Sequence, residues 1–191
     1  VPDEPEVHGL VALMEFQSSR FAARTDADGT PILLEDQDRT KWDRAQIRRG
    51  VAALERANHA VQQKGTGWGP YALQAALAEF HATAPTPEDT DWGRIVSLYD
   101  GLIQVAPSPV VELNRAVAVA MAAGPAEALQ IVDGLAGLDG SYLLPSVRGE
   151  LLSRLGRLGE AAAEFDRAAT MTDNEREREV LADKAARARG G

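Results

Sequence analysis

The amino-acid sequence predicts an all-α protein built as an array of antiparallel helical hairpins, TPR-like in its C-terminal half. Alanine is abundant and only 5% of the residues are aromatic, a composition that favours helix over sheet. Apolar residues recur at intervals of three and four positions along most of the chain. Residues 107–173 also repeat every 33 positions, close to the ~34 residues of a tetratricopeptide (TPR) hairpin.

The repeat is visible in residue size as well as in spacing. Pro107, Gly140 and Asp173 mark equivalent positions of successive units. Three further sets share this register: Ala116 with Gly149, Ala128 with Ala161, and Tyr99 with Val132 and Phe165. Small side chains let two helices approach closely, and the bulky ones fill the groove beside them. Such arrays usually bind proteins, so the repeat favours a partner-binding module.

Three helices are expected in the N-terminal half. The first covers residues 7–21 and carries apolar residues on one face: Val7, Leu10, Val11 and Met14. After a turn at residues 26–29, Thr40 is expected to cap a second helix, whose apolar positions are Ile47, Val51, Leu54 and Val61. A glycine-rich break at residues 65–70 separates it from a third helix over residues 73–80.

Six helices are expected in the C-terminal half. The apolar pattern of residues 92–103 is the cleanest amphipathic pattern of the chain. Two hairpins follow, over residues 109–135 and 144–165, each with a glycine at its turn. Pro109 suits the first position of a helix capped by Ser108. Asn174, with Glu177 three residues later, is expected to cap a last, highly charged helix.

The expected division of the chain places an N-terminal helical subdomain in residues 1–68 and the TPR-like hairpins in residues 69–191. A chain of 191 residues can bury a core of its own. Because it begins at Val1 without an initiator methionine, we expect it to be the C-terminal portion of a longer protein.

Charge and composition bound the possible partners. The net charge is −9, and a surface of this sign repels phosphate backbones, so no direct DNA binding by this segment is expected. No apolar run reaches the ~18–20 residues that span a bilayer, so no membrane contact is expected. The chain has no cysteine, which excludes disulfides and fits a cytoplasmic location.

Signatures of catalysis and cofactor binding are missing from the sequence. The three histidines, His8, His59 and His81, are too far apart for metal-ligand spacing, so no metal and no cofactor is expected. The glycine-rich loop at residues 65–69 lacks a phosphate-binding pattern, and no nucleophile elbow is present. We therefore expect no enzyme activity, with a helical enzyme of unrecognised type as a low-ranked alternative.

The segment Leu33–Arg44 is the leading candidate for a functional site. It places many hydrogen-bonding side chains beside one tryptophan: Asp36, Gln37, Asp38, Arg39, Trp42 and Arg44. One hypothesis is a docking surface with Trp42 as an aromatic anchor and the polar groups as specificity contacts. The other is a buried polar staple that ties the N-terminal helices to the repeats. The sequence favours neither.

Two arginines occupy equivalent positions of the repeat, Arg115 and Arg148, where TPR units usually carry an apolar residue. A buried guanidinium needs a carboxylate or carbonyl partner, which favours internal ion pairs over ligand binding. The first candidate partners are Asp36 and Asp38. Asn114, next to Arg115, is a weaker candidate for a groove that holds peptides.

Several strings resemble one protein family. They are Leu33–Arg44, Gly69–Ala76, Thr90–Trp92 and Pro107–Ala120, of which Asp-Gln-Asp-Arg and Asn-Arg-Ala-Val-Ala-Val-Ala are the most specific. The chain resembles, over nearly its whole length, the C-terminal TPR-like extension of bacterial extracytoplasmic-function (ECF) RNA polymerase sigma factors. It departs from ideal TPR units at the two arginines and at Asp173, which stands where a proline usually closes the unit.

The resemblance implies a regulatory domain of an alternative sigma factor, acting in transcription initiation. Its implied partners are the sigma-factor N-terminal domains in cis and the RNA polymerase core, and promoter recognition would belong to those other domains. A freestanding TPR-type adaptor that binds proteins is the alternative function.

Overall fold

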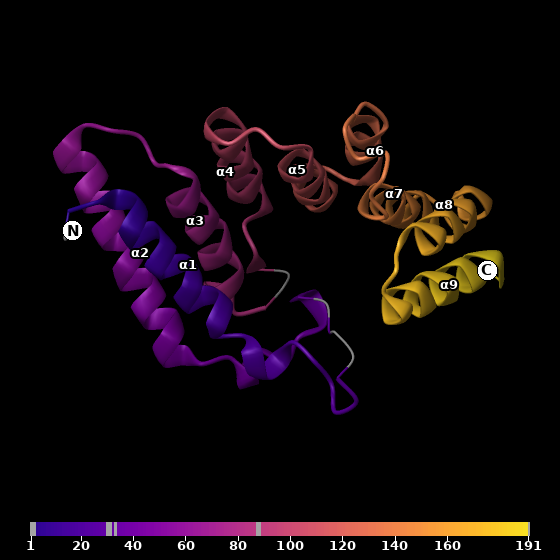
Figure 1. Ribbon diagram of the computed structural model, residues 1–191, viewed down its shortest axis with the longest axis horizontal. Coiled ribbons are helices and arrows are strands. Elements are labelled where there is room, and N and C mark those ends of the chain that lie inside the picture. Colours follow the sequence, from indigo (N-terminus) through magenta and orange to yellow (C-terminus); the bar gives the residue numbers. More distant parts are fainter. Residues whose placement is uncertain (1–2, 30–31, 33, 87–88, 191) are drawn as a thin grey trace. The chain divides into compact units, whose positions relative to one another are not determined.

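The structure is a computed structural model that describes residues 3–29, 32, 34–86 and 89–190. Every regular element in these residues is helical, which confirms the all-α array of helical hairpins (Figure 1). The α-helices are α1 Pro5–Ser18, α2 Arg44–Lys64, α3 Pro70–Thr83, α4 Trp92–Val105, α5 Pro109–Ala122, α6 Pro125–Asp133, α7 Leu143–Arg154, α8 Leu158–Met171 and α9 Glu175–Gly190. Over the described residues, none of them is both long and apolar enough to cross a membrane.

The chain divides into two compact units, which are described separately. The first contains residues 1–91 and 100–106, and the second contains residues 92–99 and 107–191, so α4 contributes to both. The expected boundary between residues 68 and 69 is not the one observed. Helix α3 packs on α1 and α2, so it belongs to the first unit.

Glycines set the close packing of the three helices of the first unit. Gly9 of α1 faces the backbone of α3, where an added Cβ would lie 2.6 Å from the Ala72 nitrogen. Gly50 of α2 leaves room for the Phe16 ring, which would lie 2.7 Å from such a Cβ. Phe16 is among the most completely buried side chains of the chain. The three-helix core thus requires residues without a side chain at these two positions.

A carboxylate of α1 caps the start of α3. Glu6 accepts hydrogen bonds from the Tyr71 nitrogen at 2.8 Å and the Ala72 nitrogen at 3.2 Å. These are two of the amides that an α-helix leaves without an internal partner, and the helix dipole favours a negative charge there. Pro70 supplies the first position of the helix, and Gly69 leaves space for the carboxylate beside it.

The start of α2 differs from the expectation. The cap is Asp43, whose carboxylate accepts from the Ala45 and Gln46 nitrogens at 2.8 and 3.1 Å. Thr40, the expected cap, lies instead in a short 3₁₀ helix, Arg39–Lys41. The Asp43 nitrogen donates to the Ser19 oxygen at 2.9 Å, so the start of α2 is joined to the end of α1.

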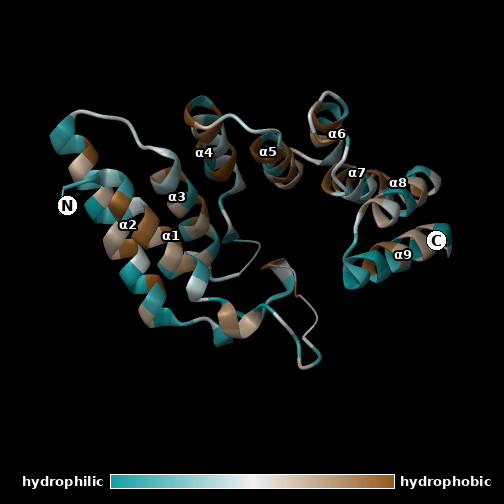
Figure 2. Cartoon of the chain, viewed as in Figure 1, coloured by the Kyte–Doolittle hydropathy of each residue, from teal (hydrophilic) through white to brown (hydrophobic). Residues whose placement is uncertain are grey.

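The second unit follows the small–bulky register of the repeat. Ala116, Ala128 and Ala161 are fully buried. Gly149 of α7 faces Phe165 of α8, whose ring would lie 2.8 Å from an added Cβ. These positions bring α5 against α6 and α7 against α8 as antiparallel hairpins. The charged helix α9, mostly hydrophilic in Figure 2, packs on α8 through a few apolar residues such as Leu181.

The helix caps of the second unit agree in part with those predicted from the sequence. Asn174 accepts from the Arg176 and Glu177 nitrogens at 3.1 and 3.4 Å, which confirms it as the cap of α9. Pro109 opens α5 as expected. Ser108 occupies the capping position, but its side chain makes no capping hydrogen bond.

The first prediction tests the close approach of α1 and α3. Gly9→Ala should lower the free energy of unfolding by about 1–3 kcal/mol, because the new methyl group meets backbone atoms that cannot move aside. Urea denaturation measures the change. Gly159→Ala on α8 is the matched control, since no atom lies within 4 Å of its added Cβ and stability there should be unchanged or slightly higher. Equal stability of the two variants would contradict the proposed packing.

Candidate functional site

The described part of the candidate segment, residues 34–44, is called here the DQDR segment. It holds two 3₁₀ helices, Leu34–Asp36 and Arg39–Lys41, and ends at the first residue of α2. Leu33, its first residue in the sequence pattern, lies outside the described residues. Asp38 caps the second 3₁₀ helix by accepting from the Thr40 nitrogen at 3.0 Å and the Thr40 hydroxyl at 2.5 Å. The segment therefore has a defined local conformation.

Arg39 joins the DQDR segment to the end of α3. Its Nη1 atom donates to the backbone oxygens of His81 and Ala84, each at 2.8 Å. Helix C-termini leave carbonyls unsatisfied and carry partial negative charge, so a guanidinium is well suited to this position. The same guanidinium lies 4.7 Å from the centre of the Trp42 ring, in cation–π geometry.

Trp42 and Gln37 lie inside the first unit. The Trp42 side chain is only 3% exposed, so it offers no aromatic surface to a partner in this conformation. Gln37 is also buried and donates from Nε2 to the Ile32 oxygen at 3.1 Å. The Gln37 Oε1 and Trp42 Nε1 atoms are buried without a hydrogen-bond partner, which costs stability unless other interactions compensate.

The other side chains of the segment point to solvent. Asp36, Asp38 and Arg44 are exposed. Hydrogen bonds from the Thr40 side chain and backbone lower the pKa of Asp38, so this carboxylate is ionised at neutral pH. The two hypotheses for the segment thus concern different residues. Arg39 and its buried neighbours have the geometry of a staple within the first unit, while the exposed side chains have the accessibility that a docking surface needs.

A group of basic residues surrounds the end of α3. Burial, together with the nearby positive charges of Arg20 and Arg39, lowers the pKa of His81 to about 4. Burial also lowers the pKa of Arg20, and the charge of Arg24 adds to this effect. His81 is therefore neutral at physiological pH, which local sequence patterns do not indicate because Arg20 and Arg39 are distant from it along the chain.

The repeat arginines lie on the first helices of successive hairpins, Arg115 on α5 and Arg148 on α7. Arg148 donates from Nε to Asp133 at 2.7 Å and from Nη1 to Glu164 at 2.6 Å, which links α6, α7 and α8. The expectation that Asp36 and Asp38 would be its partners is wrong. Its partners are carboxylates of the adjacent helices α6 and α8 in the same unit.

The remaining candidates are placed more simply. Arg115 is half-buried, and Asn114 beside it is exposed on α5. Among the described residues, no three His, Asp or Glu side chains are grouped so that they could hold a metal ion.

Comparisons with known proteins give a match to one protein family and a similar protein from a bacterium. Residues 1–58 match a family described as a family of unknown function (DUF6596), and this match includes the DQDR segment. An uncharacterized protein of Rhizobium meliloti (strain 1021) is 47% identical over 174 residues. The aligned part is 91% of this chain and 40% of the relative, so the chain spans less than half of that protein. No solved structure matches the chain.

The second prediction concerns Arg39. Arg39→Met should lower the free energy of unfolding by about 1.5–3 kcal/mol, because the carbonyls of His81 and Ala84 lose a charged donor. Arg39→Lys should recover part of the loss, since an ammonium group can still donate to the carbonyls but lacks the planar guanidinium that lies against the Trp42 ring. Urea denaturation measures both, with the exposed Arg44→Met as the matched control. If Arg39→Met had the same urea denaturation midpoint as the wild type, the hydrogen bonds of Arg39 would not stabilise the fold.

The third prediction concerns His81 and pH. Its pKa falls from an ordinary value of 6.5 to about 4 on folding, so the unfolded chain binds the proton more tightly. The contribution of this group to stability is therefore complete above pH 6.5 and is lost as the pH falls towards 4, by up to about 3 kcal/mol. Denaturation of the wild type and His81→Gln at several pH values measures it.

The histidine variant should show a shallower loss of stability over this pH range, because carboxylates then contribute the remaining slope. His59→Gln is the matched control, as His59 is exposed on α2. Parallel pH profiles for the wild type and His81→Gln would show that His81 is not buried as the structure has it.

Proposed function

We propose that this chain is the regulatory C-terminal domain of an ECF sigma factor, and that it controls transcription initiation by docking on the sigma domains or on RNA polymerase. The observation that carries the proposal is the DQDR segment. The string that resembles the sigma-factor extension most specifically is held in a fixed conformation by Arg39, while Asp36, Asp38 and Arg44 remain exposed. A surface held in this way loses little conformational entropy on binding.

Two further observations support the proposal. The relative from Rhizobium meliloti is more than twice as long as the aligned region, which leaves room for the polymerase-binding and promoter-binding domains of a sigma factor. The net charge of −9 fits a domain that contacts proteins and leaves DNA to other parts of the polypeptide. A cytoplasmic location follows from this function.

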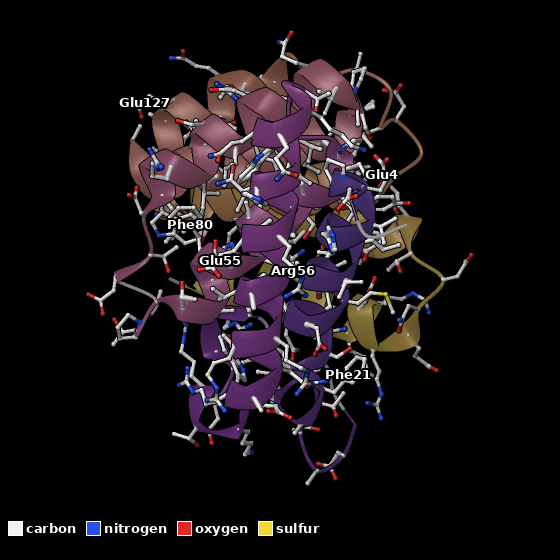
Figure 3. The ribbon with its side chains drawn as sticks, turned by 90° about the vertical axis from the view of Figure 1, so that its left-hand side faces the viewer. Glu4, Phe21, Glu55, Arg56, Phe80 and Glu127 are labelled. Carbon is white, nitrogen blue, oxygen red and sulfur yellow. The ribbon has the colours of Figure 1, made fainter. Side chains whose placement is uncertain are left out.

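The fourth prediction tests the proposal in the full-length protein. The double variant Asp36→Asn, Arg44→Gln should lower promoter-driven transcription in a reconstituted polymerase assay by about tenfold, corresponding to ~1.4 kcal/mol of docking energy. Its melting temperature should equal that of the wild type, because both side chains are exposed. Glu127→Gln, at the exposed residue of α6 labelled in Figure 3, is the matched control and should leave transcription unchanged.

The result that would contradict the proposal is transcription that does not depend on this domain. Wild-type activity of the double variant, together with wild-type activity after deletion of the whole domain, would favour the freestanding adaptor instead. A fall in transcription that accompanies a fall in melting temperature would assign the segment to stability alone.

A further inference from the structure

Helix α1 carries an apolar face that α2 and α3, the helices packed on it in the first unit, leave exposed. Val7, Leu10, Val11 and Met14 follow the helical repeat and are 38–60% exposed, Met14 the most. The opposite face is apolar as well, and Phe16 with its small neighbours packs it against α2 and α3. Isolated exposed apolar residues are ordinary, but four on one helix face form a contiguous patch. A helix that carries apolar residues on two opposite faces is usually covered on both.

Two glutamates of α1 lie beside this face, and both already have partners within the first unit. Glu6, on the side of α3, is occupied by the Tyr71 and Ala72 amides. Glu15, on the side of α2, binds Arg49 through two hydrogen bonds at 2.8 and 3.0 Å. The face is therefore an apolar strip about one helix wide, flanked by groups whose charges are already compensated.

The C-terminal end of the face is basic. Gln17 lies one turn after Met14, and its Oε1 atom accepts from the Nη2 atoms of both Arg20 and Arg24, each at 2.7 Å. Arg24 also donates to the Gln17 backbone oxygen and stacks at 5.1 Å over Phe21, which is 65% exposed. In Figure 3 the labelled Glu4 and Phe21 mark the two ends of this helix.

The two guanidinium groups share one neutral acceptor. Within the described residues, neither Arg20 nor Arg24 has an ion pair with a carboxylate. Half-buried guanidinium groups normally obtain such a partner, and this chain has an excess of carboxylates to provide one. The pair therefore has unused capacity for a carboxylate from outside the unit.

We propose that the apolar face of α1 and the Arg20–Arg24 pair form one docking surface, called here the α1 surface, for an acidic amphipathic helix. The partner helix has apolar residues at i, i+3 or i+4, and i+7, with a carboxylate at the end that meets the arginines. Its source is the sigma-factor part of the same polypeptide, a statement that rests on the function proposed above.

Shape and charge select this occupant. A strip of four side chains over two helical turns matches the ridge of one packed helix. A carboxylate satisfies the planar donors of a guanidinium better than any neutral group. A second copy of the chain fits poorly, because four side chains that are already about half covered add far less than the ~1,200 Å² that stable interfaces bury.

The test uses two synthetic helical peptides with the same leucine face, one with glutamates and one with lysines at the end that meets Phe21. Fluorescence anisotropy with the purified chain should show at least tenfold tighter binding of the glutamate peptide. Met14→Gln and Arg24→Gln should each weaken that binding about tenfold. Val180→Gln is the matched control, since Val180 is an exposed apolar residue of α9.

Three results would overturn the α1 surface as proposed. They are equal affinity for the two peptides, binding that Met14→Gln leaves unchanged, and a dimer in sedimentation analysis that Met14→Gln dissociates. The last of these would make a second copy the occupant. Met14 is exposed and Arg24 is half-buried, so circular dichroism verifies that each variant is folded.

The source of the helix is tested in the full-length protein by hydrogen exchange of residues 7–14. Their amides should be better protected than in the isolated chain, and Arg24→Gln should remove the extra protection. Equal protection, with transcription still dependent on Asp36 and Arg44, would refute this inference and leave the proposed function intact. Transcription that is indifferent to deletion of the domain would refute the proposed function, while the peptide preference of the α1 surface would stand.

Discussion

Close approach between helices is the constraint on which both units depend. In the first unit, α1 can contact α2 and α3 only because Gly9 and Gly50 leave space for a backbone and for the Phe16 ring. In the second unit, Gly149 provides the same space for Phe165. The interior of a protein is packed as densely as an organic crystal, so each missing side chain is matched by an atom of the neighbouring helix. The relation between helix axes is therefore fixed by residues that carry almost no surface of their own.

The position of the DQDR segment follows from that packing. The end of α3 lies where α1 places it, and Arg39 recognises the carbonyls exposed at this end. Trp42 then covers the guanidinium, so the charge is shielded from water on one side while Nη1 donates to the two carbonyls. This arrangement also fixes the position of the exposed side chains of the segment. A structural tie and an accessible surface are thus two consequences of the same eleven-residue stretch.

The sequence predicted the architecture well, since the 33-residue register placed the small and bulky residues of α5–α8 correctly. It could not predict which carboxylates meet Arg148, because local spacing says nothing about which side chains of adjacent helices come together. Thr40 was the expected cap of α2, but Asp43 competes better as it stands directly before the helix. The sequence also could not predict which side chains of the DQDR segment are buried and which are exposed. Short 3₁₀ helices lack the long apolar periodicity from which burial is predicted.

The buried face of helix α1 was also difficult to predict from the sequence. Periodicity identified the face with Val7 and Met14, yet the face that packs in the core carries Gly9, Ala12 and Phe16. Small residues produce a weak hydrophobic signal although they permit the closest contacts. In such a helix, the strongest apolar stripe in the sequence can be the one that remains available to a partner.

The α1 surface and the DQDR segment are connected by electrostatics. The positive charges of Arg20 and Arg39 both lower the pKa of His81, and the charge of Arg24 lowers the pKa of Arg20. A carboxylate bound at Arg20 and Arg24 would offset the charge that Arg20 places near His81, and would therefore raise the pKa of this histidine. Because coupling between two binding equilibria is reciprocal, docking on α1 and protonation of His81 should favour each other. His81 is thus the group through which occupation of the α1 surface affects the end of α3, where Arg39 of the DQDR segment binds.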